Sequence, residues 1–150
     1  MARSPIHHIL VFTDGTKSSF RAADYAIELA CAVGARLTAM AVVDTDTLRQ
    51  LLNVRILVDS EMVDFENELQ QSARNQLDEV RQRAMKMRLK FEDVLRSGNS
   101  EGIVPVELSE RGVDLLVMGA FSSARARFDL IARQRQQLLD RAPCPVIVVR

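Results

Sequence analysis

Five short runs of apolar residues, separated by segments long enough to form helices, constrain the fold of this chain more than any other feature. Each run is apolar at successive positions, which is typical of parallel strands that helices cover on both faces of a sheet. Strands that alternate with helical segments form βαβ units. We therefore expect an α/β fold, with a doubly wound five-stranded parallel sheet and helices on both faces. The expected strands are residues 8–13, 36–43, 89–95, 114–119 and 145–149.

The first two segments between the runs carry the spacing of amphipathic helices. Residues 16–33 have one charged face, because their charged side chains recur three or four positions apart. Thr16 can cap the start of this helix and Gly34 its end. Apolar residues recur at the same spacing in the second half of residues 44–86, which predicts a helix there. Residues 44–60 are apolar but irregular, and we assign no element to them. The charged face consists of Lys17, Arg21, Asp24 and Glu28.

Two shorter helices are predicted later in the chain, over residues 100–111 and 127–141. Pro105 must lie in the first turns of its helix, because proline in a helix interior costs about 3 kcal/mol. Right-handed crossovers then permit strand orders 3-2-1-4-5 and 2-1-3-4-5. In either order a ligand is expected beyond the carboxyl ends of the strands, at the point where the strand order reverses. This rule draws attention to residues 13–15, 42–44 and 119–123.

Composition narrows the classes of function. Lys plus Arg equals Asp plus Glu, at 20 each, so bulk charge does not favour a nucleic acid or an anionic membrane as partner. No stretch reaches the ~18–20 apolar residues of a membrane span. The first five residues lack a signal peptide's apolar run, and two cysteines do not make a disulfide framework. We expect one domain over residues 1–150, in the cytoplasm.

The chain offers little material for catalysis or metal binding. His7 and His8 are adjacent, so a strand would point them to opposite faces, and the chain has no other histidine. Cys31 lies on an apolar helix, where we expect it in the core. Cys144 lies between two prolines before a buried strand, where a packing role is expected. Without a nucleophile–base pair we expect no covalent catalysis. Because the histidines and cysteines lack the spacing of metal ligands, we also expect no metal site.

Four sequence blocks, in order and at matching spacings, resemble those of the universal stress protein family. They are ILVFTDGT at residues 9–16, AVVD at 41–44, GVDLLVMG at 112–119 and APCPVIVV at 142–149. The resemblance covers almost the whole chain. It implies the adenine nucleotide alpha hydrolase-like version of the doubly wound sheet, and it selects strand order 3-2-1-4-5.

Many members of that family bind ATP, and the resemblance implies a set of nucleotide-binding residues. Asp14, next to Thr13, would contact the nucleoside, and backbone groups near Val42 would hold the adenine. Asp14 can equally be a turn residue before glycine. A glycine-rich loop of pattern G-x2-G-x9-G-[ST] would hold the phosphates through close backbone N–H groups.

That phosphate loop departs from the family pattern. Gly119 fills the first position, but Ser122, Ala132 and Arg133 occupy the other three. Serine or alanine disfavours positive φ and fills space that a phosphate oxygen would use. The resemblance therefore implies a degraded ATP loop. Ser122 and Ser123 can still donate to an anion or simply form a loop, so the candidate cofactor-binding residues are Thr13, Asp14, Val42, Gly119, Ser122, Ser123 and Arg133.

Arginines accumulate near the C-terminus, with a local net charge of +3 between residues 120 and 141. They could form an anion site, because arginine binds phosphate bidentately, or only a solvated helix face, which we favour. Arg135 differs from the others because it shares a stripe with apolar residues. Such a charge snorkels, pairs with an acid, or faces a partner. The stripe contains Phe128, Ile131, Leu138 and Ala142.

These observations lead to two hypotheses of function. The first is a non-catalytic, dimeric stress-response protein with no cofactor, acting on an unknown regulatory protein partner. The second is a member that binds ATP, AMP or another adenine nucleotide through Asp14 and the Gly119 loop. This second hypothesis includes weak ATP hydrolysis as an alternative. We expect a homodimer because the last strand lies at a sheet edge and is β-branched throughout. Arg135, Leu138 and Leu139 would add to an interface formed by Val146, Ile147, Val148 and Val149.

Overall fold

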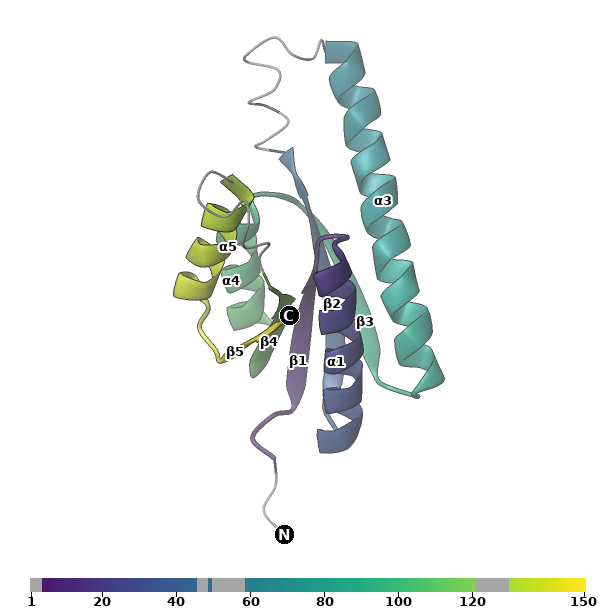
Figure 1. The fold of residues 1–150 in the computed structure, drawn as a ribbon, viewed down its shortest axis with the longest axis vertical. Coiled ribbons are helices and arrows are strands. Elements are labelled where there is room, and N and C mark those ends of the chain that lie inside the picture. Colours follow the sequence, from purple (N-terminus) through teal and green to yellow (C-terminus); the bar gives the residue numbers. More distant parts are fainter. Residues whose placement is uncertain (1–3, 46–48, 50–58, 121–129) are drawn as a thin grey trace.

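The sheet has five parallel strands in the order β3-β2-β1-β4-β5, as predicted. The structure is a computed structural model that describes residues 4–45, 49, 59–120 and 130–150. In Figure 1 the purple β1 lies in the middle of the sheet, with β2 and β3 on one side of it and β4 and β5 on the other. The strands are β1 His8–Thr13, β2 Arg36–Asp44, β3 Phe91–Gly98, β4 Leu115–Gly119 and β5 Val146–Val149.

Helices cover both faces of this sheet (Figure 1). Helices α1 Lys17–Val33 and α3 Asp59–Lys86 pack on one face, where apolar side chains of β1, β2 and β4 meet them in one core. Helices α4 Ser100–Glu110 and α5 Leu130–Arg141 pack on the other face, where they form a second core. The three central strands β1, β2 and β4 are therefore buried on both sides, which explains their continuous apolar runs.

The ends of α1 follow the sequence prediction. Thr16 caps its start by accepting a hydrogen bond from the Ser19 backbone N–H at 3.2 Å. Gly34 ends it in the left-handed conformation, at φ 72°, where a side chain would be strained. The four charged residues of the predicted polar face are all exposed. The loop between β1 and α1 is short, because it spans only residues 14–16 and ends at the Thr16 cap.

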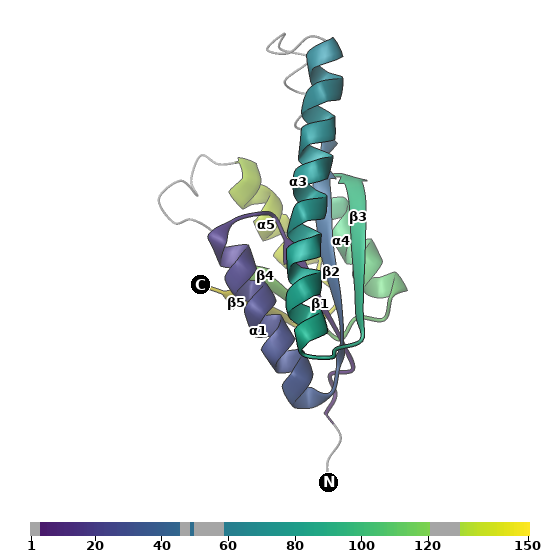
Figure 2. The same cartoon turned by 90° about the vertical axis from the view of Figure 1, so that its right-hand side faces the viewer.

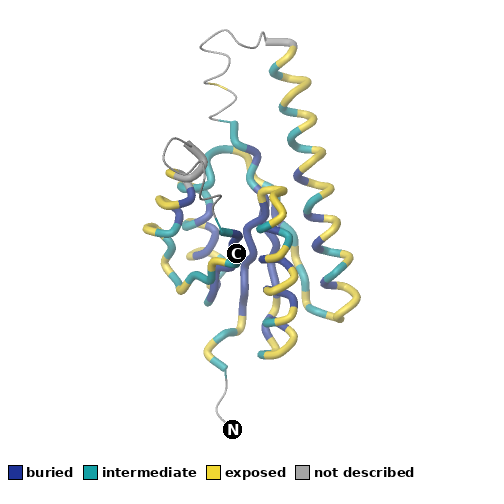
Figure 3. Tube along the Cα trace, in the orientation of Figure 1, coloured by how far each residue is buried: buried dark blue, intermediate teal, exposed yellow. Residues whose placement is uncertain are grey.

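Helix α3 extends well past the end of the sheet (Figure 2). Its C-terminal half buries the predicted apolar stripe against β2 and β3, while Val63 and Phe65 near its start are 59% and 38% exposed. Figure 3 shows the same change from buried to exposed along the helix. The predicted stripe is thus confirmed where the helix faces the sheet, at the half-buried Leu69 and at the buried Ala73, Leu77, Val80 and Ala84.

Strand β3 begins two residues later than predicted and continues to Gly98. Leu89 belongs to the turn after α3, because its N–H donates to the Ala84 carbonyl at 3.3 Å and Arg88 adopts φ 57°. The polar residues 96–98 remain in the strand because they pair with β2 through its last residue. Part of the predicted 127–141 helix, residues 127–129, lies outside the described residues.

Pro105 lies inside α4, in its second turn. Proline has no N–H, so the carbonyl of Glu101, four residues earlier, loses its helical partner. The Arg141 Nη1 of α5 donates to that carbonyl at 3.4 Å instead. An inter-helix hydrogen bond therefore compensates for the proline.

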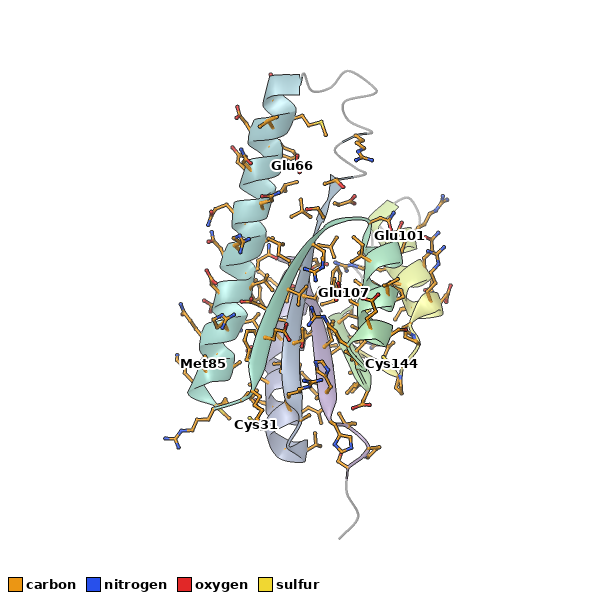
Figure 4. All side chains as sticks on the ribbon, turned by 180° about the vertical axis from the view of Figure 1, so that it is seen from behind. Cys31, Glu66, Met85, Glu101, Glu107 and Cys144 are labelled. Atoms are coloured by element: carbon orange, nitrogen blue, oxygen red, sulfur yellow. The ribbon has the colours of Figure 1, made fainter. Side chains whose placement is uncertain are left out.

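The prediction that Cys31 lies in the core is wrong, because its side chain is exposed. Position 31 continues the charged face of α1 by one more step of three beyond Glu28. Cys144 is half-buried and packs against the α4–α5 core, in agreement with a packing role, and burial raises the pKa of its thiol. Figure 4 shows the two cysteines apart from each other and below Glu101, with Cys144 on the same side of the view as Glu101.

The suggested contribution of α5 to a dimer interface is also wrong for two of its three residues. Leu138 is fully buried in the α4–α5 core, and Arg135 is 9% exposed. Leu139 is half-buried and packs against the same core. These side chains therefore pack within the protomer.

Candidate functional site

The switch point of the sheet lies between β1 and β4. From β1 the chain builds outward through β2 to β3, and then crosses to β4 on the other side. The β1–β4 ladder reaches Val11 and Val117, and the two strands continue beyond it to Thr13 and Gly119. Doubly wound sheets bind ligands in the crevice at this position.

The start of α1 closes tightly against the end of β4. A Cβ atom on Gly119 would lie 2.6 Å from the Ser18 carbonyl carbon and 2.7 Å from the Ser19 backbone nitrogen. The Ser18 hydroxyl donates to the Ala120 carbonyl at 3.1 Å. Gly119 therefore has a packing reason to be glycine, independent of any ligand.

Asp14 uses both of its carboxylate oxygens within the protein. Its Oδ1 accepts from the Thr16 backbone N–H at 3.1 Å and from the Thr16 hydroxyl at 2.6 Å. Its Oδ2 forms an ion pair with the Arg135 guanidinium of α5. The Asp14 side chain is 23% exposed and that of Arg135 is 11% exposed, so solvent screens this pair only in part.

Arg135 reaches from α5 across the carboxyl end of the sheet. Besides Asp14, its guanidinium contacts the Ala120 carbonyl, with Nη1 donating at 3.4 Å. Burial lowers the pKa of the Arg135 guanidinium from its ordinary value. Of the alternatives for a charge in the apolar stripe, pairing with an acid is confirmed.

The remaining candidate residues are distributed unevenly. Thr13 is buried, and its hydroxyl donates to the Met40 carbonyl at 3.4 Å. Val42 lies one residue beyond the end of the β1–β2 ladder, at the same edge as Asp14. Arg133 is exposed on α5, because two helical positions place it about 200° around the helix from Arg135. Ser122 and Ser123 lie outside the described residues.

Sequence reasoning thus assembled Thr13, Asp14, Val42 and Gly119 at one edge, but missed two participants. The Ser18 contact has no sequence signal, because a serine in a first helical turn is ordinary. The Arg135–Asp14 pair did have one, since a charge interrupted an apolar stripe, but the acid could not be identified from spacing alone.

The one buried histidine lies elsewhere and does other work. His8 Nε2 bonds the Thr38 hydroxyl at 2.7 Å, and Nδ1 bonds the Arg111 carbonyl at 3.2 Å. Burial and the charge of Arg36 lower the pKa of His8. His8 and Thr38 are 4% and 1% exposed, so this His–hydroxyl contact is closed to a substrate.

Within the part of the chain that the structure describes, His, Cys, Asp and Glu side chains nowhere form a group of three or more that could hold a metal ion. Over the same residues, no helix is both long and apolar enough to cross a membrane.

Comparison with known proteins gives a consistent family. The sequence pattern of the universal stress protein family matches residues 5–150. No curated protein matches the chain. The solved structure of universal stress protein UspA from Lactobacillus plantarum is 23% identical, covers 98% of this chain and 99% of its own, and has a TM-score of 0.74.

Two similar structures carry an adenine nucleotide. A universal stress protein in complex with cAMP is 23% identical, covers 98% of this chain and 99% of its own, and has a TM-score of 0.72. The universal stress protein from Archaeoglobus fulgidus in complex with dAMP is 14% identical, covers 97% and 98%, and has a TM-score of 0.63. At these identities the likeness establishes a shared fold.

Proposed function

Because the chain belongs to the universal stress protein family, we propose that it is a non-catalytic, dimeric regulatory protein of the cytoplasmic stress response whose ATP-binding loop is degraded. One observation carries the loss of ATP binding: Asp14, the carboxylate at the switch point, is already satisfied by Thr16 and Arg135. A nucleoside hydroxyl would have to displace one of these contacts. The substitutions Ser122, Ala132 and Arg133 in the phosphate loop support the same proposal.

The absence of catalysis is supported by what the described side chains do. The His8–Thr38 contact resembles a base beside a hydroxyl, but both groups are buried in the sheet. Catalytic hydroxyls need access to a substrate atom. Cys144 has a raised thiol pKa, which disfavours the reactive thiolate. Both cysteines are free, which suits a reducing compartment such as the cytoplasm.

Calorimetric titration with Mg-ATP tests the degraded loop. We expect no binding at micromolar affinity, and a dissociation constant near 1 μM, about −8.2 kcal/mol, would overturn this part of the proposal. The triple variant Ser122→Gly, Ala132→Gly, Arg133→Ser restores the family pattern and should tighten whatever binding exists. Unchanged affinity in that variant would show that the loop does not hold the phosphates.

The dimer is supported by the edge position of β5. On one side β5 pairs with β4, through bonds that include Leu116 N–H to the Pro145 carbonyl at 3.0 Å and Ala120 N–H to the Val149 carbonyl at 2.6 Å. Backbone groups alternate in direction along a strand, so those of Val146 and Val148 point to the open edge. Antiparallel pairing of two copies would satisfy both edges.

Val148→Pro tests this interface without touching the β4 ladder. Proline removes the N–H that points to the open edge and is tolerated at an edge strand. Val148→Thr is the matched control, because it keeps the N–H and the β-branched shape. In analytical ultracentrifugation the wild type and the control should exceed the 16.8 kDa protomer mass, and the proline variant should approach it. A wild type near 16.8 kDa, or a folded proline variant that stays dimeric, would refute pairing through β5.

The second candidate function is a nucleotide-binding member, favoured by the similar structures solved with cAMP and with dAMP. Both of those ligands are adenine mononucleotides, which need less of a phosphate loop than ATP. Thermal-shift titration with AMP, cAMP and ADP separates the two functions. A ligand at 100 times its dissociation constant stabilises the folded state by about 2.7 kcal/mol, whereas a non-binder gives no shift.

A further inference from the structure

We propose that Arg135 is an internal latch that bridges the switch point and excludes nucleosides from it, so that this one residue determines the ligand specificity of the site. The inference deepens the proposed function, on which it rests. It starts from the position of the crevice between the ends of β1 and β4, where a doubly wound sheet binds its ligand.

The latch joins both sides of that crevice. The Arg135 guanidinium pairs with Asp14, which follows β1, and donates to the carbonyl of Ala120, which follows β4. The same Ala120 carbonyl also accepts from Ser18 at the start of α1. One cation therefore connects α5 with the β1, β4 and α1 ends that surround the ligand position. A crevice bridged in this way has its polar groups satisfied from within.

The burial of Arg135 makes the latch difficult to displace. Its side chain is 11% exposed, so opening would leave a guanidinium and a carboxylate separated in a partly dry environment. Removing one partner from such a pair is strongly unfavourable, because the other charge loses its compensation. A ribose hydroxyl offers Asp14 only a neutral donor, and a charge-assisted hydrogen bond is roughly twice as strong as a neutral one. A neutral nucleoside therefore does not compete with Arg135 for the carboxylate.

Removal of Arg135 should open the crevice. When only a small fraction of a protein is in the form that can bind, the measured affinity is the intrinsic affinity reduced by that fraction. Deleting the latch should raise the fraction with an open site and so restore the intrinsic affinity. We expect Arg135→Ala to bind adenosine at least about tenfold more tightly than the wild type. Adenosine is the chosen probe because it carries no phosphate, and the result is independent of the phosphate loop.

Arg141→Ala is the matched control. It removes the same charge from the same helix, but Arg141 is exposed and lies six positions away from the latch. Its affinity for adenosine should equal that of the wild type. If Arg135→Ala fails to fold, Arg135→Gln replaces it, because glutamine keeps a long polar side chain while abolishing the ion pair. Folding is checked by circular dichroism before each titration.

The experiment is calorimetric titration of the wild type, the Arg135 variant and the control variant with adenosine, followed by Mg-ATP. Tighter adenosine binding by the Arg135 variant, with the Arg141 variant unchanged, supports the latch. Equal affinity in the wild type and the Arg135 variant, or an equal gain in the Arg141 variant, overturns it. The ratio of the adenosine affinities of the variants and the wild type tests the latch. Micromolar binding of Mg-ATP by the wild type would instead contradict the degraded loop of the proposed function. Failure of the latch and failure of the proposed function are therefore distinguishable.

Discussion

Gly119→Ala should destabilise the protein even when no ligand is present. The added Cβ would lie 2.6 Å from the Ser18 carbonyl carbon, and 2.7 Å from both the Ser18 hydroxyl oxygen and the Ser19 nitrogen. Two of these three atoms are backbone, so they can move only if the first turn of α1 moves. Overpacking of this kind typically costs about 1–3 kcal/mol.

A smaller effect of the same substitution has the opposite sign. Alanine restricts the unfolded chain more than glycine and so stabilises the folded state by about 0.4–1 kcal/mol. We therefore expect Gly119→Ala to lower the free energy of unfolding by about 1–2 kcal/mol, combining overpacking with this offset. For a domain of this size the melting temperature would fall by about 2–8 °C.

Urea denaturation of wild type and variant, without nucleotide, measures this difference. The double variant with Ser18→Ala removes the hydroxyl contact but leaves both backbone contacts, so it should recover only a small part of the loss. A Gly119→Ala variant within about 0.5 kcal/mol of the wild type would refute the packing argument, because that is the range of ordinary surface substitutions.

Three other predictions concern stability. Burial opposes ionisation of Glu107, but hydrogen bonds from Arg111 at 2.7 Å and Arg96 at 2.9 Å outweigh it and lower its pKa. The stabilisation of the folded state by ionised Glu107 is present above the unfolded pKa near 4.5 and is lost as pH falls through the folded pKa. Glu107→Gln should therefore lower the free energy of unfolding by about 1.5–3 kcal/mol at pH 7 and by much less in acid. Chemical denaturation at several pH values measures this difference. His8 has a lowered pKa, so stability should be full above its unfolded value of 6.5 and fall as pH drops below it; His8→Gln should flatten that dependence in the same assay. Leu138→Ala should cost about 2–5 kcal/mol in urea yet leave the mass in ultracentrifugation unchanged, and a change of mass at full stability would contradict its place in the core.

The fold was predictable from sequence because the strands of this sheet are buried on both faces. The apolar runs identified the strands, and the three- and four-residue spacing in the segments between them identified the helices. Both patterns follow from which residues are buried. Prediction was weakest where a side chain's environment is mixed. Strand β3 lies at an edge and is polar beyond Leu95, so its last three residues carried no strand signal. Cys31 was misplaced because its chemistry suggested a core position, while its spacing from Glu28 indicated the exposed face.

The candidate site was predictable only as a location. Topology placed Asp14 and Gly119 at the switch point, because carboxyl ends of parallel strands meet at one edge. What occupies that edge depends on α5, which lies more than a hundred residues after Asp14 in the chain. The apolar stripe of α5 indicated that Arg135 would snorkel, pair with an acid or face a partner, and the sequence did not decide among these. The identity of that partner is a tertiary fact, and the Arg135–Asp14 ion pair appears only once the two faces of the sheet are assembled.

Gly119 shows how a motif residue can persist for a reason other than the ligand of the motif. Its position was assigned to a phosphate loop in which small residues admit phosphate oxygens. In the structure the absent side chain instead admits the backbone of Ser18 and Ser19 at the start of α1. Helix packing therefore requires a glycine here whether or not a nucleotide binds. The proposed latch accordingly depends on the pairing of Arg135 with Asp14 and not on this glycine.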